Sequence, residues 1–159
     1  MKKKVLVIGS GSIAKRHIKN ILKLKSKINI SLFSRNKKRA KIFLKNFKSK
    51  NISLINSNNL KRDRFTHVVI ASDTLSHNKY ISHFIKNCKN IYCEKPLPID
   101  KHTRSLINIS KNRLDNEKVK VGFQFRFNPV IQFLKKELKK KENKNVNLIK
   151  FFCGQNLKD

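Results

Sequence analysis

Residues 5–14 read Val-Leu-Val-Ile-Gly-Ser-Gly-Ser-Ile-Ala, and this stretch decides the fold. Its first part, Val5–Ile8, is a continuous apolar run rich in β-branched residues, which is typical of a strand buried on both faces of a parallel sheet. After the glycines, Ile13, Ile18 and Ile21 recur at helical spacing with basic residues between them. The stretch therefore predicts a strand, a glycine-rich turn and a helix that begins at Ser12.

The turn contains two of the four glycines of the chain, Gly9 and Gly11. Glycine at the first position permits a tight turn, and glycine at the second lets the backbone approach a pyrophosphate. A small third residue, here Ala14, allows the helix to pack closely on the strand, and the free N–H groups of the helix N-terminus attract phosphate. A turn with incidental glycines is the alternative. We predict that a dinucleotide is bound by Gly9, Ser10, Gly11, Ser12, Ile13 and Ala14.

The rest of the chain alternates in the same way between apolar runs of strand length and stretches of helical period. Further strands are predicted at 28–34, 52–55, 67–71, 90–93 and 119–125, and further helices at 40–47, 76–87, 99–113 and 129–138. Residues 56–63 are predicted to be a polar connection. Such alternation indicates an α/β fold, a Rossmann-type doubly wound parallel sheet with helices on both faces. We expect a dinucleotide-binding domain at 1–125, then a crossover helix and the start of a second domain at 126–159, with at most one strand of it, at 146–152.

The end of the second predicted strand bears on the choice of cofactor. An acidic residue that holds the ribose 2′-hydroxyl is expected about 20 residues after the glycine turn, but the chain has Ser34 and Arg35 there. A guanidinium can bind a 2′-phosphate through two charge-assisted hydrogen bonds. The sequence therefore favours NADP over NAD, with Arg35 as an ordinary surface cation as the alternative.

The composition of the chain bears on its partners, its metal content and its location in the cell. The chain has 159 residues with 39 Lys and Arg against 9 Asp and Glu, a formal net charge of +30. Such a charge attracts nucleic acid or anionic lipid, but basic residues occur in every segment, so we predict a compositional bias, no specific nucleic-acid partner and no membrane association. The apolar run after Met1 is too short for a signal peptide. Three cysteines without paired spacing argue against disulfides and a structural metal site, and favour the cytoplasm.

Four motifs together resemble one known family. In chain order they are the glycine turn at Gly9, Ser72-Asp-Thr-Leu-Ser-His77 after a predicted strand, Glu94-Lys95-Pro96 after the next one, and Gly122-Phe-Gln-Phe-Arg126-Phe-Asn128-Pro129. Over residues 3–152 the sequence is similar to the glucose-fructose oxidoreductase and inositol dehydrogenase family, written Gfo/Idh/MocA.

The resemblance implies roles for particular residues. Lys95 matches the family lysine between nicotinamide and substrate, where a cation stabilises developing alkoxide charge, and Glu94 would orient it. Further cofactor contacts are implied for Ala71, Ser72, Asp73, His77, Glu94 and Pro96. His77 is equally well explained as a packing residue. Arg126 or Asn128 could reach the substrate, although Asn128 before Pro129 is better explained as a helix cap. His17, His67, His83 and His102 show no partner spacing and are interpreted as structural or surface residues.

The resemblance also implies a function. It is an NAD(P)-dependent oxidoreductase that transfers hydride between a nicotinamide cofactor and a hydroxyl carbon of a small sugar-like or polyol substrate. Family members carry a second domain that closes over the nicotinamide, so we expect a truncated, inactive form, a homo-oligomer, or a second chain that supplies the missing domain. A non-catalytic dinucleotide-binding or sensor protein is the alternative.

Overall fold

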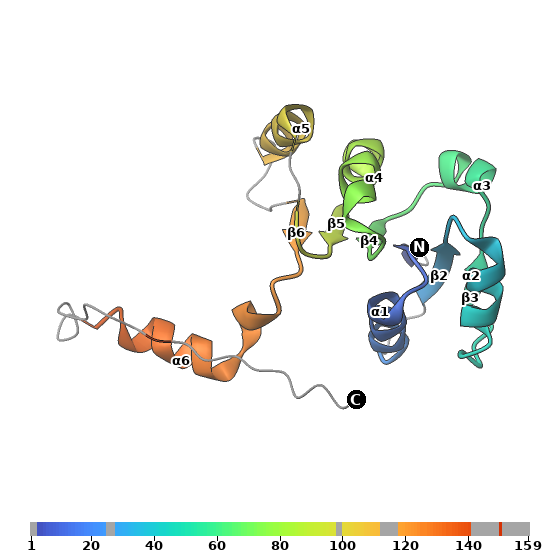
Figure 1. The fold of residues 1–159 in the computed structure, drawn as a ribbon. Coiled ribbons are helices and arrows are strands. Elements are labelled where there is room, and N and C mark those ends of the chain that lie inside the picture. Colours follow the sequence, from blue (N-terminus) through green and yellow to red (C-terminus); the bar gives the residue numbers. More distant parts are fainter. Residues whose placement is uncertain (1–2, 25–27, 98–99, 112–117, 141–149, 151–159) are drawn as a thin grey trace. The chain divides into compact units, whose positions relative to one another are not determined.

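A computed structural model describes residues 3–24, 28–97, 100–111, 118–140 and 150 (Figure 1). The chain divides into two units, Met1–Gly122 and Phe123–Asp159. The first unit holds the sheet and the predicted cofactor turn. The second holds the segment that was predicted to cross to another domain.

The first unit is built on a six-stranded sheet in which all neighbouring strands are parallel. Its strands are β1 (Lys3–Ile8), β2 (Ile28–Phe33), β3 (Ile52–Leu54), β4 (His67–Ile70), β5 (Asn90–Cys93) and β6 (Val119–Val121). Their order across the sheet is β3-β2-β1-β4-β5-β6. The predicted Rossmann-type α/β fold is therefore confirmed. The order reverses between β1 and β4, and a crevice opens at the carboxyl ends of strands at such a switch point.

Helices connect these strands. They are α1 (Ser12–Leu22), α2 (Lys37–Leu44), α3 (Ser57–Arg62), α4 (His77–Phe84) and α5 (Lys101–Lys111), with a 3₁₀ turn η1 (Thr74–Ser76) before α4. The second unit contains the 3₁₀ turn η2 (Gln124–Phe127) and the helix α6 (Pro129–Glu137). As predicted, the Asn128 side chain caps α6, because its Oδ1 accepts from the backbone N–H of Val130 at 2.9 Å.

Alternating side chains of β1 divide the core into two layers. Val5 and Val7 belong to the apolar cluster that contains residues of α1 and α2, such as Ile18. Leu6 and Ile8 belong to the other cluster, which contains residues of α4, such as Ile81. Because successive side chains of a strand point to opposite faces, β1 is covered on both sides. This double burial explains why the strand is apolar at every position from Val5 to Ile8.

The structure corrects several predicted boundaries. The connection at 56–63 contains the helix α3, because the Asn56 side chain caps it at the Asn59 N–H and Leu60 is buried. The strand predicted at 119–125 ends at Val121, and Phe123, Phe125 and Phe127 are exposed rather than paired in the sheet. Alternating phenylalanines resemble a strand, but no strand among the described residues pairs with their backbone.

Three further helices also differ from prediction at their ends. The helix α2 covers 37–44 instead of 40–47, since the Asn36 side chain caps it at the Arg39 N–H. The predicted helix at 76–87 is the 3₁₀ turn η1 followed by α4, which ends at Phe84. The helix α5 is described from Lys101 to Lys111 against a prediction of 99–113. The strand predicted at 146–152 falls outside the described residues except for Lys150.

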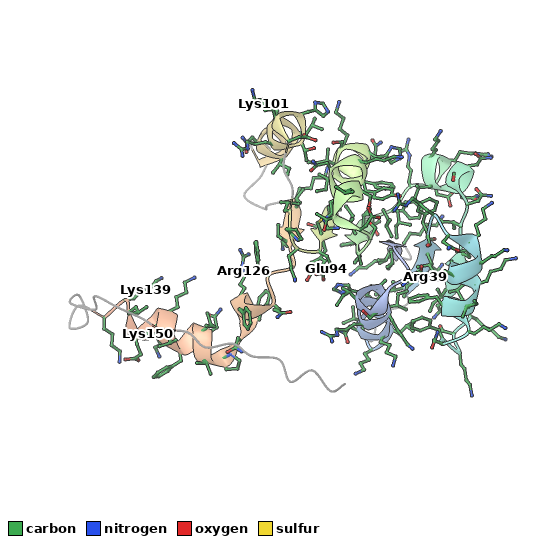
Figure 2. All side chains as sticks on the ribbon, in the orientation of Figure 1. Arg39, Glu94, Lys101, Arg126, Lys139 and Lys150 are labelled. Carbon is green, nitrogen blue, oxygen red and sulfur yellow. The ribbon has the colours of Figure 1, made fainter. Side chains whose placement is uncertain are left out.

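Side chains that end in nitrogen project from all the helices drawn in Figure 2, rather than from one face of one element. No helix in the described part of the chain is long and apolar enough to cross a membrane. Among the described residues, no group of three His, Cys, Asp or Glu side chains is placed to hold a metal ion.

Candidate functional site

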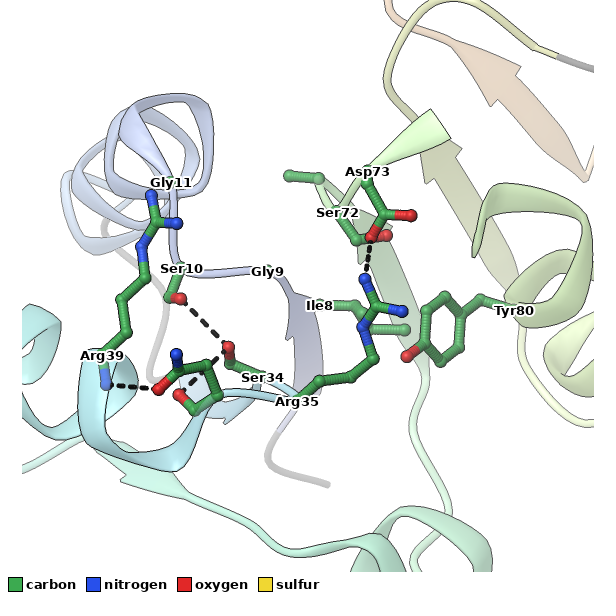
Figure 3. A pocket seen from close by; sticks show the side chains of 12 residues that line it. Ile8, Gly9, Ser10, Gly11, Ser34, Arg35, Arg39, Ser72, Asp73 and Tyr80 are labelled. Atoms are coloured by element: carbon green, nitrogen blue, oxygen red, sulfur yellow. Dashed lines mark hydrogen bonds and ion pairs between the residues drawn. The ribbon is translucent and has the colours of Figure 1, made fainter. Parts of the chain in front are cut away.

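A pocket of about 470 Å³ lies at the carboxyl ends of β1, β2 and β4 (Figure 3). The segment after β1 contributes the glycine turn, the segment after β2 contributes four polar residues, and the segment after β4 contributes three residues. The aromatic ring of Tyr80 is added from α4. The lining residues are Ile8, Gly9, Ser10, Gly11, Ser34, Arg35, Asn36, Arg39, Ala71, Ser72, Asp73 and Tyr80.

The two glycines of the turn meet different demands. Gly9 has a φ of +118°, and a Cβ atom there would lie 2.2 Å from the carbonyl oxygen of Ala71. Only glycine therefore allows β1 to turn this close to the end of β4. A Cβ atom on Gly11 would meet nothing within 4 Å, so the space beside the N-terminus of α1 is open to a ligand. No side chain caps α1, and the first N–H groups of this helix can bind a pyrophosphate.

Serine and asparagine side chains order the segment after β2. The hydroxyls of Ser10 and Ser34 lie 3.0 Å apart, which joins the glycine turn to the end of β2. The Asn36 side chain accepts from the Arg39 N–H at 2.9 Å and begins α2. Figure 3 shows the Arg39 side chain on the same side of the pocket as Ser10 and Gly11. Two arginines therefore border the pocket from the segment where a 2′-phosphate was predicted to bind.

Arg35 spans the pocket to the segment after β4. Its Nη2 lies 2.5 Å from Oδ2 of Asp73, and both side chains are largely exposed. Tyr80 is buried and packs edge-on against Phe33 with ring centroids 6.3 Å apart. Burial raises the pKa of the Tyr80 phenol, with smaller opposing effects from Arg35 and Asp73. Tyr80 thus offers the pocket a neutral ring with a polar tip.

A second cluster surrounds the predicted catalytic segment after β5. Oε1 of Glu94 lies 2.7 Å from Nε2 of His17 on α1, and the imidazole packs edge-on against Tyr92 at 5.0 Å between ring centroids. A Cβ atom on Gly122 would lie 2.6 Å from the Tyr92 hydroxyl and 3.2 Å from Glu94 Oε1, so glycine leaves room for this cluster. Burial, and then Glu94, raise the pKa of Tyr92. Lys95 is exposed beside this cluster.

His77 joins the two loops that the resemblance singled out. It is 1% exposed, its Nδ1 lies 3.0 Å from the carbonyl oxygen of Pro96, and its Nε2 lies 3.2 Å from that of Ser72. The ring is therefore placed between the loop after β4 and the loop after β5. It does not line the pocket, and this location fits the packing alternative for His77.

The structure brings most of the predicted cofactor residues together. Those that line the pocket are Gly9, Ser10, Gly11, Ser34, Arg35, Ala71, Ser72 and Asp73. Ser12 and Ile13 are exposed on α1, whereas Ala14 is buried under it and lets the helix pack on the sheet. Glu94, Lys95 and Pro96 lie after β5, outside the lining of the pocket, and Arg126 lies on η2 in the second unit.

Four residues were missed. Asn36, Arg39 and Tyr80 line the pocket, and His17 pairs with Glu94. The interpretation of His17 as a structural or surface residue named no partner, and the structure adds one, a carboxylate on a strand end 77 residues away in sequence. A capping asparagine followed by an arginine in the first turn is a signal that could have placed Asn36 and Arg39 beside the pocket. Nothing local could have linked His17 to Glu94.

Comparisons with known proteins show what the chain is similar to as a whole. Glucose-6-phosphate 3-dehydrogenase from Bacillus subtilis (strain 168) is 25% identical over 154 residues, which are 97% of this chain and 43% of that protein. The myo-inositol dehydrogenase from Lactobacillus casei, solved in complex with NAD(H) and myo-inositol, matches 87% of this chain and 41% of its own with a TM-score of 0.71 and 23% identity. A Gfo/Idh/MocA family oxidoreductase from Vibrio cholerae matches 86% of this chain and 43% of its own with a TM-score of 0.66 and 19% identity.

The structural matches show a shared fold, and the chain spans less than half the length of each of these proteins. The model of one family, described as an oxidoreductase family with an NAD-binding Rossmann fold, matches residues 3–115. With the glycine turn, the sheet order and the pocket all in agreement, this chain belongs to the Gfo/Idh/MocA oxidoreductase family.

Proposed function

We propose that this chain is the cofactor-binding part of an NAD(P)-dependent oxidoreductase that transfers hydride to or from a hydroxyl carbon of a sugar-like or polyol substrate. The observation that carries the proposal is the pocket at the β1–β4 switch point, with the open N-terminus of α1 beside Gly11. Open space beside a glycine and uncapped N–H groups are what a pyrophosphate requires.

Catalysis is assigned to the loop after β5. The nicotinamide, when bound, accepts or supplies the hydride. Lys95 is exposed on this loop, and its ammonium group can bind the substrate hydroxyl and stabilise alkoxide charge as the hydroxyl loses its proton. Glu94 precedes it and is held by His17 at 2.7 Å, which fixes the base of the loop. The Lys95 side chain makes no hydrogen bond or ion pair with other described residues, so it is free to meet a substrate.

The cofactor that we favour is NADP. The segment after β2 carries Arg35, and Arg39 in the first turn of α2, at the pocket, and it has no acidic residue that would hold a ribose 2′-hydroxyl or repel a 2′-phosphate. Ser34 adds a hydroxyl to the same segment. Two guanidinium groups and a hydroxyl form a suitable set of donors for a phosphate.

The substrate class rests on the relatives. Their names give glucose 6-phosphate and inositols as the molecules on which they act or which they bind. We propose that Lys95 meets a substrate of this sugar-like kind, and Arg126, on η2, is a separate candidate for a substrate contact. The part of the protein that shields the reacting groups from water would be supplied by further residues, by a homo-oligomer or by a second chain. A cytoplasmic location agrees with Cys88 and Cys93, which are both free thiols.

Binding is tested by titrating the chain with NADPH and NADH and following nicotinamide fluorescence at moderate salt. We expect tighter binding of NADPH, and we expect Arg35→Ala to remove most of that preference. Arg62→Ala, which makes the same change of charge on α3 away from the pocket, should leave it intact. Tighter binding of NADH, or an unchanged preference in Arg35→Ala, would contradict the assignment of NADP.

Turnover is tested with NADP and either myo-inositol or glucose 6-phosphate. We expect little or no turnover by the 159-residue chain, because hydride transfer needs the carbon held in a site closed to water. In a form extended to the length of its relatives, Lys95→Ala should lower kcat far more than cofactor affinity, with Lys86→Ala as the control. A short chain that oxidises polyols without needing Lys95 would overturn the catalytic assignment. An extended form that binds cofactor but has no activity would support the sensor alternative.

A further inference from the structure

The pocket carries an acidic residue where the sequence pattern does not place one. The end of β2 lacks the usual acid, yet Asp73, in the loop after β4, lies 2.5 Å from the Arg35 guanidinium (Figure 3). We propose that Asp73 sets the cofactor preference of this protein by competing with the 2′-phosphate for Arg35. The inference rests on the proposed function, because it concerns the same dinucleotide pocket.

Asp73 is held in place independently of Arg35. It begins the 3₁₀ turn η1, and the Ser76 hydroxyl donates to its backbone carbonyl at 2.8 Å and approaches its Oδ2 at 3.3 Å. The Ser76 hydroxyl also lies 2.7 Å from that of Ser72. The carboxylate therefore occupies a defined place at the rim of the pocket, and the long Arg35 side chain is the partner that can swing.

The competition follows from the charges. Arg35 offers one planar fork of donors, and an arm of it already points at Asp73. A dinucleotide without a 2′-phosphate leaves this ion pair intact. A 2′-phosphate that engages the Arg35 fork must take it from Asp73, and it must also approach a carboxylate of like charge. Arg39 has no acidic partner among the described residues. A 2′-phosphate that binds Arg39 therefore does not have to displace a carboxylate.

The expected size of the effect is moderate. Both side chains of the pair are largely exposed, 69% for Arg35 and 44% for Asp73. Exposed pairs are weak because water and salt screen them. Removing the competitor should therefore strengthen binding of the 2′-phosphate by about threefold to tenfold and should leave the rest of the dinucleotide unaffected.

The experiment measures the Kd of NADP⁺ and of NAD⁺ by calorimetry at one fixed salt concentration, for the 159-residue chain and four variants. In Asp73→Asn, which keeps the shape and the hydrogen bond from Ser76, the ratio of the Kd of NADP⁺ to that of NAD⁺ should fall by about threefold to tenfold. Asp63→Asn makes the same change of net charge at the C-terminal end of α3, outside the lining of the pocket. It should alter neither the Kd of NADP⁺ nor that of NAD⁺.

Two further variants, Arg35→Ala and Arg35→Ala/Asp73→Asn, separate a direct ion pair from a general charge effect. In Arg35→Ala/Asp73→Asn, compared with Arg35→Ala alone, most of the gain for NADP⁺ should be lost, since the competition needs Arg35 and only the repulsion between the 2′-phosphate and Asp73 remains to be relieved. An equal gain with and without Arg35, an equal gain in Asp63→Asn, or an unchanged NADP⁺ to NAD⁺ ratio in Asp73→Asn would each overturn the inference while the pocket still binds dinucleotide. If the unmodified chain binds neither NADP⁺ nor NAD⁺, the proposed function is overturned, and the inference with it.

Discussion

The two units of this protein differ in the burial of their apolar side chains. In the first unit, Leu6 and Ile18 are fully buried on opposite faces of the sheet. In the second, Phe127 and Phe133 are 80% and 62% exposed, and no described residue covers them. The helix α6 therefore owes its start to local signals, the Asn128 cap and Pro129. The comparison teaches that a correctly predicted helix need not belong to a core.

The largest effect that we expect distinguishes the two units directly. Leu6→Ala removes a buried side chain from the central strand and should lower the free energy of unfolding by about 3 kcal/mol or more. Phe133→Ala, although it deletes a larger side chain, should change it by less than about 0.5 kcal/mol. Urea unfolding followed by circular dichroism measures both. Comparable losses in the two variants would mean that α6 is packed into a core.

The next effect tests whether the turn of the first unit is as tightly constrained as its core. Gly9→Ala introduces a Cβ atom 2.2 Å from the Ala71 carbonyl oxygen at a φ of +118°, and should cost about 2 kcal/mol or more. The matched variant Gly11→Ala meets open space and should have a small effect on unfolding. It should nevertheless weaken binding of NADPH, because the methyl group takes up space proposed for the pyrophosphate. Equal stability of the two variants would contradict this account of the turn.

Buried thiols extend the comparison to chemical reactivity. Burial raises the pKa of Cys93 to about 12 and that of Cys88 to about 11. The thiolate is the reactive form, so near neutral pH both should be alkylated at least about tenfold more slowly than in urea. The rate in the folded protein should rise with pH towards these values. Alkylation by iodoacetamide in a Cys153→Ser background measures this, and rapid labelling of the folded chain would show that the core opens readily.

The smallest effect concerns the helix of the second unit alone. Asn128→Ala removes the cap from two N–H groups of α6 and should destabilise that helix by about 1 kcal/mol. Unfolding of the first unit should be unchanged, because α6 lies in the other unit and has no buried residue. Amide hydrogen exchange resolves the two units. Faster exchange confined to α6 is expected, whereas faster exchange in β1 would link the units energetically.

Local signals explain which features the sequence could predict. The strands β1, β4 and β5 are apolar runs, and the turn at Gly9 has its own glycine pattern, so the sheet and much of the pocket followed from short stretches of sequence. The helix α3 was missed because only one of its residues, Leu60, is buried.

Pairs between distant segments could not be predicted in the same way. His17 meets Glu94 across 77 positions, and Arg35 meets Asp73 across 38. Each pair depends on strand ends that the fold brings together. In a chain of net charge +30, the sequence does not indicate which basic residue pairs with a given acidic one. Of the four site residues that sequence reasoning missed, His17 is of this kind.

The buried ring of His77 has a consequence for how the two loops behave. Each of its nitrogens faces a carbonyl oxygen, that of Pro96 at 3.0 Å and that of Ser72 at 3.2 Å. A neutral imidazole carries a single N–H, so it can donate to one of these oxygens and must turn a lone pair toward the other. Only the doubly protonated ring satisfies both. The loop after β4 and the loop after β5 therefore compete for the single N–H of a neutral ring, and the tautomer decides which of the two carbonyls is hydrogen-bonded.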